Sequence, residues 1–313
     1  MDIFWHVLMN NLLPLSVMIA LGVVLQRAFS LDIKTLSKLN FYLFSPSIIF
    51  NLLYTTDLSV AMVGQVLVFF VLFMLLQYGV LEILVRARGY RGGMRAAVRN
   101  SVLFYNSGNY AIPLNQLAFG GNPYALSVQV LIMMMQSLIP NTYGIYAVNA
   151  HRSDLQRIMR TILSMPVIYA IPLAFGLRGL GVELPVFIHA PIGYLADAFI
   201  GTALVTLGVQ LGSMKWQIKG PMMTDLGLAI ALRLLGGPLL AWLVVMALDA
   251  WVMDVPALMA AALIVSSSVP TSLSSVLLAV EFDNEPEFAS QVVFLSTMLS
   301  IVTATGVIYL LQA

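Results

Sequence analysis

Two short polar segments interrupt long apolar stretches of the chain, and each of them surrounds a proline. Their amides and hydroxyls can donate and accept hydrogen bonds, which suits the binding of a polar organic ligand better than covalent catalysis. The residues that we single out for substrate binding in these segments are Asn106, Asn109, Pro113, Ser266, Ser268, Pro270 and Thr271.

The two prolines also release backbone groups. A proline inside a helix lacks the N–H that would bond to the carbonyl four residues earlier. Pro113 therefore frees the carbonyl of Asn109, and Pro270 does the same for Ser266. Interrupted helices at matching places in two halves of a chain point to a transporter's binding site, and the positive N-terminal end of the helix beyond each interruption favours an anion. The alternative is that both segments only bind neighbouring helices to one another.

Two ionisable residues, Arg233 and Asp197, each lie near the middle of a long apolar stretch. Such groups are costly inside a membrane and are usually functional or paired. Arg233 could bind a substrate carboxylate, which its planar guanidinium suits. Alternatively, the two residues could form a buried structural pair, or Asp197 could carry a coupling proton.

Asn141 directly follows Pro140 in the next apolar stretch, and Gln136 precedes both. We add Asn141 to the candidate substrate-binding residues because its stretch follows the first polar segment in the chain. Gln136 could face the same site or could instead bond neighbouring helices.

The sequence argues against an enzyme and against a metal site. The chain has no cysteine, and its three histidines share no metal-ligand spacing. The motifs HExxH, GxSxG and the P-loop are all missing from it. A net charge of +1 gives no reason to expect nucleic acid as a partner.

Composition assigns the chain to the membrane. It is 60% hydrophobic and only 9% charged, whereas soluble domains carry about 25% charged residues. Because a helix that spans a bilayer needs about 20 mostly apolar residues, we predict ten spans, at residues 4–26, 35–54, 58–85, 94–119, 123–149, 157–178, 185–213, 221–248, 254–280 and 287–312.

The basic residues give this arrangement an orientation. With ten spans, all but two of the fifteen Lys and Arg residues fall on one side of the membrane. The exceptions are Arg178, on the other side, and Arg233, inside a span. The positive-inside rule then predicts a multi-pass protein of the cell (inner or plasma) membrane with both termini outside the cytoplasm.

Ten spans divide into two halves of five, residues 1–150 and 151–313. An odd number of spans in each half makes the halves face opposite ways, which predicts an inverted repeat. The two polar segments occupy the fourth span of each half, at 94–119 and 254–280.

These segments resemble the auxin efflux carrier family. The element Asn106-Ser-Gly-Asn109-x-x-x-Pro113 is similar to the family's signature in its fourth span. The similarity covers essentially the whole chain through shorter motifs, which are Leu-Leu-Pro14, Leu21-Gly22, Leu39-x-x-Tyr42-x-x-x-Pro46, Leu207-Gly208, Ser-Val-Pro270 and Ala289-Ser290. Short loops make the chain similar to the bacterial members, some of which are assigned to malonate or malate transport.

The resemblance implies a fold and a site. It implies an all-α, elevator-type carrier whose architecture is similar to that of bile-acid sodium symporters. Spans one, two, six and seven would form a scaffold and a dimer contact. Spans three to five and eight to ten would form a moving transport domain, with spans four and nine broken and crossing. Family members bind an organic anion beside that crossing, and by motif this role falls to Asn109 and Asn141.

We therefore expect a secondary active or facilitative transporter of a small organic anion, a mono- or dicarboxylate, with coupling to protons, to sodium or to neither. The hydroxyl-rich run 266–268 leaves open a sodium-coupled symporter of a larger amphipathic anion. A third hypothesis is a membrane sensor that binds an organic anion without moving it. The expected partners are the anion, the lipid bilayer and a second copy of the chain, with no cofactor.

Overall fold

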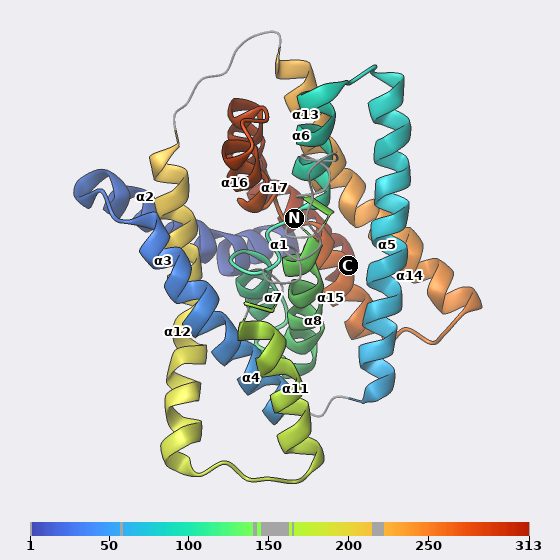
Figure 1. Cartoon of the computed structure of the whole chain (residues 1–313). Helices are drawn as coiled ribbons and strands as arrows, with labels where there is room; N and C mark the ends of the chain where they lie inside the picture. Colours follow the sequence, from blue (N-terminus) through green and yellow to red (C-terminus); the bar gives the residue numbers. More distant parts are fainter. Residues whose placement is uncertain are drawn as a thin grey trace.

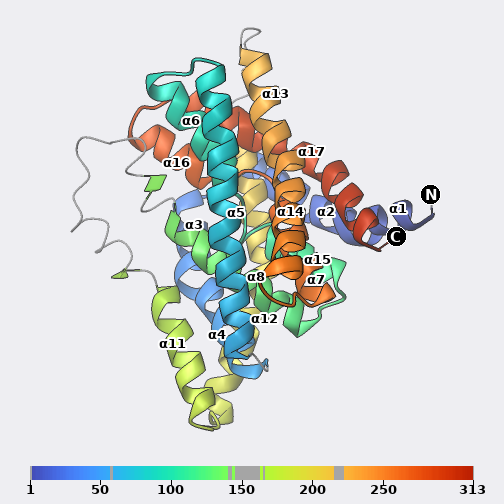
Figure 2. The same ribbon diagram turned by 90° about the vertical axis from the view of Figure 1, so that its right-hand side faces the viewer.

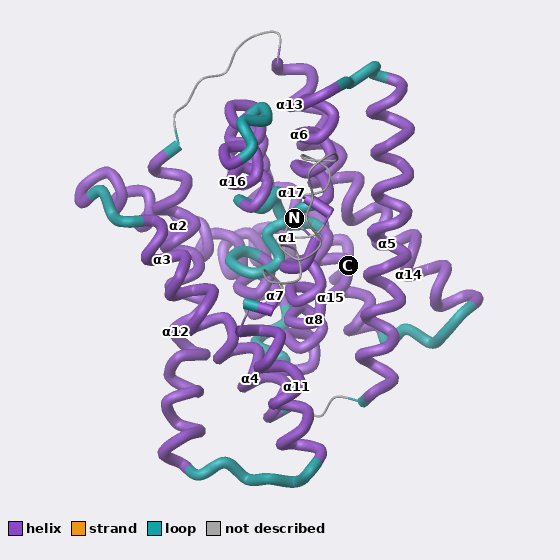
Figure 3. The backbone as a smooth tube through the Cα atoms, viewed as in Figure 1, coloured by secondary structure: helices purple, strands orange, loops and turns teal. Residues whose placement is uncertain are grey.

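The computed structural model describes residues 2–56, 59–139, 143–144, 163–164, 166–214 and 222–312. Within these residues every regular element is a helix (Figure 3). The one extended pairing among them is an isolated bridge between Tyr105 and Thr271. Helices satisfy all their backbone hydrogen bonds internally, as lipid requires. The prediction of an all-helical membrane protein is confirmed for the described residues.

The first half of the chain forms helices joined by short connections. Polar side chains fix where several of them begin. Asp32 accepts a hydrogen bond from the N–H of Thr35 at 2.7 Å, and Ser59 accepts one from the N–H of Met62 at 3.1 Å. The elements, with η for π-helical turns, are α1 (Asp2–Val7), η1 (Leu8–Leu12), α2 (Leu13–Phe29), α3 (Ile33–Leu39), η2 (Asn40–Phe44), α4 (Ser45–Thr55), α5 (Val60–Ala87), α6 (Gly92–Leu103), α7 (Ala111–Ala118) and α8 (Pro123–Ile139).

Like the first half, the second half contains several long helices and one consecutive pair of short helices. Its described elements are α11 (Pro166–Gly179), α12 (Val186–Ser213), α13 (Met223–Ala231), η5 (Leu232–Gly236), α14 (Gly237–Trp251), α15 (Ala257–Ser267), α16 (Ser274–Glu281) and α17 (Pro286–Gln312). The helices fall on the predicted apolar segments, although parts of 123–149 and 157–178 lie outside the described residues.

Five helical stretches of the described chain are long and apolar enough to cross a membrane. They are Trp5–Phe29, Ala61–Ala87, Val186–Ser213, Met223–Trp251 and Pro286–Leu311. The shorter apolar helices of the described chain are Pro123–Ile139, Ile168–Gly179 and Ala257–Ser267. Two of the predicted spans are divided in the structure. Residues 94–119 form α6 and α7, and residues 254–280 form α15 and α16.

Helices α2 and α12 pack against each other at very short range. Gly22 of α2 faces Gly208 of α12, and a Cβ atom added to either glycine would lie 2.8 Å from the Cα atom of the other. Only glycine allows two helix backbones to approach this closely. The two glycines belong to the Leu-Gly motifs at 21–22 and 207–208, so the packing gives those motifs a physical cause.

Figures 1 and 2 show how the other helices are arranged around this pair. Helix α4 packs on α11 and α12, while α5 packs on α6, α8 and α14. The N-terminal α1 contacts α17, so the two ends of the chain lie close together (Figure 2).

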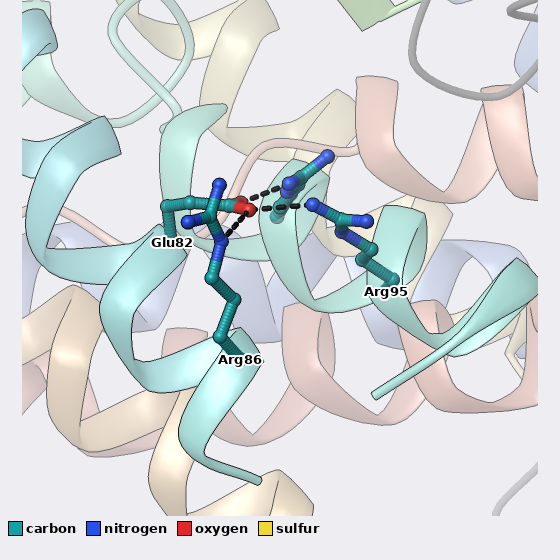
Figure 4. Close-up of polar contacts among 4 residues, drawn as sticks. Glu82, Arg86 and Arg95 are labelled. Carbon is teal, nitrogen blue, oxygen red and sulfur yellow. Dashed lines mark hydrogen bonds and ion pairs between the residues drawn. The ribbon is translucent and has the colours of Figure 1, made fainter. Parts of the chain in front are cut away.

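One network of charges ties the end of α5 to α6 (Figure 4). Glu82 accepts hydrogen bonds from Arg86 at 2.9 Å and from Arg95 at 2.5 Å, and its second oxygen accepts one from Arg99. The carboxylate of Glu82 therefore holds three arginines together.

Candidate substrate site at two helix interruptions

The candidate site is built on the two places where helices stop and restart. The first interruption lies between the end of α6 at Leu103 and the start of α7 at Ala111. The second lies between the end of α15 at Ser267 and the start of α16 at Ser274.

The two interruptions bind each other through their backbones. The N–H of Asn106 donates to the carbonyl of Pro270 at 2.9 Å, and the N–H of Ser272 donates to the carbonyl of Phe104 at 2.8 Å. The hydroxyl of Thr271 donates to the carbonyl of Ser101 at 2.7 Å. These bonds give partners to backbone groups that lose their helical hydrogen bonds where each helix stops. Such partners are needed because buried backbone N–H and C=O groups must be hydrogen-bonded. The interruptions therefore cross and hold each other in place.

Pro113 lies in the first turn of α7 and not at the interruption itself. Its neighbours Ile112 and Leu114 donate their N–H groups to the carbonyls four residues earlier, at 3.3 Å and 3.0 Å. Pro113 has no N–H to donate, so the carbonyl of Asn109 lacks the corresponding bond, as the sequence predicts. The helix stops well before Pro113, because the segment from Phe104 onward pairs with the second interruption. Pro270 does lie inside its interruption, and its carbonyl contributes to the crossing.

A cavity of about 140 Å³ lies beside the crossing. Asn106 and Asn109 of the first interruption and Ser272 of the second form part of its wall. Gln136 of α8 and Gln210 of α12 also line it. The described lining residues include several amides and hydroxyls but no Asp, Glu, Lys or Arg. The cavity is therefore neutral, with several polar groups set in a mainly apolar wall.

The N-terminal ends of both restarting helices border this cavity. Gly108 and Asn109, directly before α7, are lining residues, and so are Ser272 and Ser274 at the start of α16. Helix N-termini carry partial positive charge and unpaired N–H groups. The side chain of Asn109 is half-buried and bonds no described residue, so its amide is available to a ligand.

The other predicted substrate-binding residues have different places. Ser266, Ser268 and Thr271 are buried at the second interruption behind the cavity wall, and none of them lines the cavity. Asn141 lies outside the described residues.

Arg233 lies behind the site and makes no contact with a carboxylate among the described residues. Its side chain is fully buried. Its Nε donates to the carbonyl of Val269 at 3.1 Å and its Nη1 to that of Val102 at 3.0 Å, while Nη2 donates to the carbonyl of Ser267. Asp197 is exposed on α12, so the two residues do not form the buried pair that the sequence left open.

Sequence reasoning missed several lining residues. Ser37, Asn40 and Ser45 come from the second apolar stretch of the chain, far from either polar segment. Asn40 donates to the hydroxyl of Thr206 at 2.7 Å and Gln210 donates to that of Ser37 at 3.3 Å, which fixes this wall to α12. One feature of the sequence could have identified these lining residues, which is that they are polar residues inside apolar stretches.

Comparison with known proteins identifies the family. A model of the membrane transport protein family matches residues 151–308, about half of the chain. An uncharacterized transporter of Methanothermobacter thermautotrophicus is 26% identical over 303 residues, which cover 94% of this chain and 95% of that protein. The apolar helices and the family match together make the chain a multi-pass membrane transporter. The chain belongs to the membrane transport proteins of the auxin efflux carrier family.

Proposed function

We propose that the protein moves a small organic anion, a mono- or dicarboxylate, across the membrane, and that the cavity beside the crossing is its substrate site. The observation that carries this proposal is the position of that cavity. Its mainly apolar wall holds amides and hydroxyls but no described charged side chain, and the N-terminal ends of α7 and α16 border it. Transporters of several folds bind the carboxylate of a substrate at such half-helix ends.

The chemistry of the wall suits an anion that must also be released. The amides of Asn106 and Asn109 and the hydroxyl of Ser272 can donate hydrogen bonds to carboxylate oxygens. A fixed cation in the wall would bind the anion more strongly and slow its release. A cavity of about 140 Å³ is close to the roughly 150 Å³ that holds one benzene molecule. It therefore has room for a short carboxylate such as malonate.

The cavity also supports an elevator mechanism. Ser37 and Asn40 line it from the first helices of the chain and Gln210 lines it from α12, while Asn109 and Ser272 line it from the crossing. We assign α1 to α4, α11 and α12 to a scaffold, and α5 to α8 and α13 to α17 to a transport domain. Movement of the second unit along the first would then expose the site to each side of the membrane in turn.

Two further parts of the proposal concern the whole chain. The short α6–α7 and α15–α16 pairs occupy corresponding places in residues 1–150 and 151–313, which supports ten spans in an inverted repeat. The adjacent ends of the chain agree with an even number of spans, and the positive-inside rule then favours termini outside the cytoplasm. We place the homodimer contact on the scaffold, where Leu13, Val17, Leu21 and Val24 form an exposed apolar row on α2.

Asp197 stays a candidate for proton coupling, because its carboxylate is exposed on α12 and bonds no described residue. An Asp197→Asn carrier that still moves substrate but no longer responds to a pH gradient would support this role. Unchanged coupling would remove it.

The proposal is tested by uptake of labelled malonate, malate and an indole carboxylate into proteoliposomes, with and without sodium and pH gradients. We expect saturable uptake of at least one short carboxylate by the wild type. We expect Asn109→Ala to lower kcat/KM at least tenfold, which corresponds to the loss of about 1.4 kcal/mol of binding.

Asn10→Ala is the matched control, since Asn10 is exposed and bonds only His6 across one helical turn. This variant should transport like the wild type. Saturable ligand binding without uptake would favour the sensor hypothesis. Failure of every carboxylate to bind or to be taken up by folded protein would contradict the proposal.

A further inference from the structure

Arg233 occupies a site that is unusual for a charged side chain. It lies in the π-helical turn η5, which joins α13 to α14, and its exposed fraction is 0%. Its guanidinium contacts no carboxylate among the described residues, and the bonds it makes are to three backbone carbonyls. Burying a charge is costly unless its surroundings compensate it. Those three carbonyls must therefore supply the compensation.

The carbonyls come from the negative ends of two helices. Val102 lies in the last turn of α6, Ser267 ends α15, and Val269 lies two residues beyond that end. Helix C-terminal ends carry partial negative charge and carbonyls without an internal partner. Two such ends meet at Arg233. In transporters with discontinuous helices, half-helix ends and unwound carbonyls of this kind coordinate sodium ions.

Two neighbours show that the space is shaped for the guanidinium. A Cβ atom at Gly237 would lie 2.6 Å from Nη2 of Arg233 and 2.6 Å from the carbonyl oxygen of Ser267, so only glycine leaves that bond intact. On another side, the ring of Tyr105 lies against the guanidinium, with 4.6 Å between the guanidinium carbon and the ring centroid.

Two of the three hydroxyls in the run 266–268 are directed away from Arg233. Ser267 donates to the carbonyl of Ile264 and Ser268 donates to that of Val265, both at 2.7 Å. Each hydroxyl therefore bonds within its own helix turn. The run 266–268, which motivated the hypothesis of a sodium-coupled symporter, contributes a backbone carbonyl to Arg233.

We propose that Arg233 is a built-in cation that fills the position of a coupling ion at the crossing. It neutralises the joined C-terminal ends of α6 and α15, so the crossing needs no sodium to hold together. Arg233 is then a positioning residue for the substrate site, because the same crossing carries Asn106 and Asn109. The claim that the crossing is stable without sodium does not depend on the proposed function. The further expectation that uptake needs no sodium does rest on the proposed function.

The test is thermal unfolding of the purified protein in sodium chloride and in choline chloride at equal ionic strength. The wild type should melt at the same temperature in both salts. Arg233→Ala should melt several degrees lower in choline chloride and should recover part of that loss in sodium chloride, because an ion can then reach the carbonyls. Arg233→Lys, which keeps the charge, should melt above Arg233→Ala and show no response to sodium.

A second pair of variants keeps the test valid if Arg233→Ala does not fold. Gly237→Ala forces the guanidinium away from Ser267 and should lower the melting temperature by several degrees. The adjacent Gly236→Ala is its control, since an added Cβ there meets its nearest atoms at 3.8 Å and 3.9 Å, which is ordinary contact. This control should melt within about a degree of the wild type.

Three results would overturn the proposal. One is a wild type that sodium stabilises by several degrees over choline, which would reveal a separate sodium site. The second is an Arg233→Ala protein that folds and ignores sodium, which would reduce Arg233 to an ordinary structural residue. The third is a Gly237→Ala protein that melts no lower than Gly236→Ala. Since unfolding needs no substrate, each result can be read even if no carboxylate is transported.

Discussion

The guanidinium of Arg233 lies against the ring of Tyr105, and Tyr105 in turn lines the candidate substrate cavity. The ring is also packed edge-on against Phe73, with 6.4 Å between the ring centroids. A single aromatic side chain thus separates a buried positive charge from the site of an anion. Tyr105 is therefore a wall that the Arg233 site and the cavity share.

Tyr105→Leu should therefore weaken both stability and transport. The change removes the cation–π contact and leaves space beside Phe73, so we expect a loss of about 2–3 kcal/mol in the free energy of unfolding. Tyr105→Phe keeps the ring and should cost less than about 1 kcal/mol. Thermal unfolding of the two variants checks this, and equal losses would show that the ring contact contributes little.

The glycine contact between α2 and α12 gives a second prediction. Gly22→Ala or Gly208→Ala would place a methyl group 2.8 Å from a Cα atom of the other helix, so the helices must separate. We expect a loss of about 2–3 kcal/mol in stability. Gly201→Ala on α12 is the control, because the nearest atom is the end of the flexible Met18 at 3.8 Å. Similar melting temperatures for all three variants would contradict the close packing.

The sequence identified much of this fold, for reasons that can be stated residue by residue. Apolar stretches predict helices reliably where lipid is the solvent, so the described helices coincide with the predicted segments. The polar residues around Pro113 and Pro270 located both interruptions. The first interruption begins well before its proline, because the segment that contains Tyr105 pairs with Thr271 of the second interruption.

The site was less predictable than the fold. Asn106 and Asn109 line the cavity as their residue types indicated. The partners of Arg233 are backbone carbonyls, which every residue possesses, so no side-chain pattern could reveal them. The wall formed by Ser37, Asn40 and Gln210 depends on contacts between residues far apart in the chain, which a single sequence does not contain.

The Glu82 network gives a third prediction. Glu82→Gln removes the only carboxylate that the three arginines share, and the side chain of Arg99 is just 13% exposed. We expect a loss of about 2–3 kcal/mol in stability from the uncompensated charges. Arg86→Ala should cost less than about 1 kcal/mol, because that side chain is 75% exposed to solvent and its pair is screened. Equal costs for the two substitutions would argue against a shared network.

A fourth prediction concerns alkaline pH. Burial raises the pKa of Tyr90 to about 12, and its hydrogen bond to Asp225 acts in the same direction. The folded protein therefore holds this proton more tightly than the unfolded chain, whose tyrosine pKa is near 10. The resulting stabilisation is present below pH 10 and is lost as the pH rises toward 12. Tyr90→Phe should be less stable at pH 8 and should lose less further stability over this range than the wild type does.

The central claim is that the cavity at the crossing binds the transported anion. The chain has no cysteine, so a single cysteine can be introduced at Ser272, which lines the cavity. Its rate of reaction with a membrane-impermeant thiol reagent would be measured with and without the carboxylate that the wild type transports. Ser213→Cys, exposed near the end of α12 and outside the cavity, is the control. We predict that the anion slows the labelling of Ser272→Cys alone. Labelling of Ser272→Cys at an unchanged rate, under saturating anion in a variant that still transports it, would place the substrate site elsewhere.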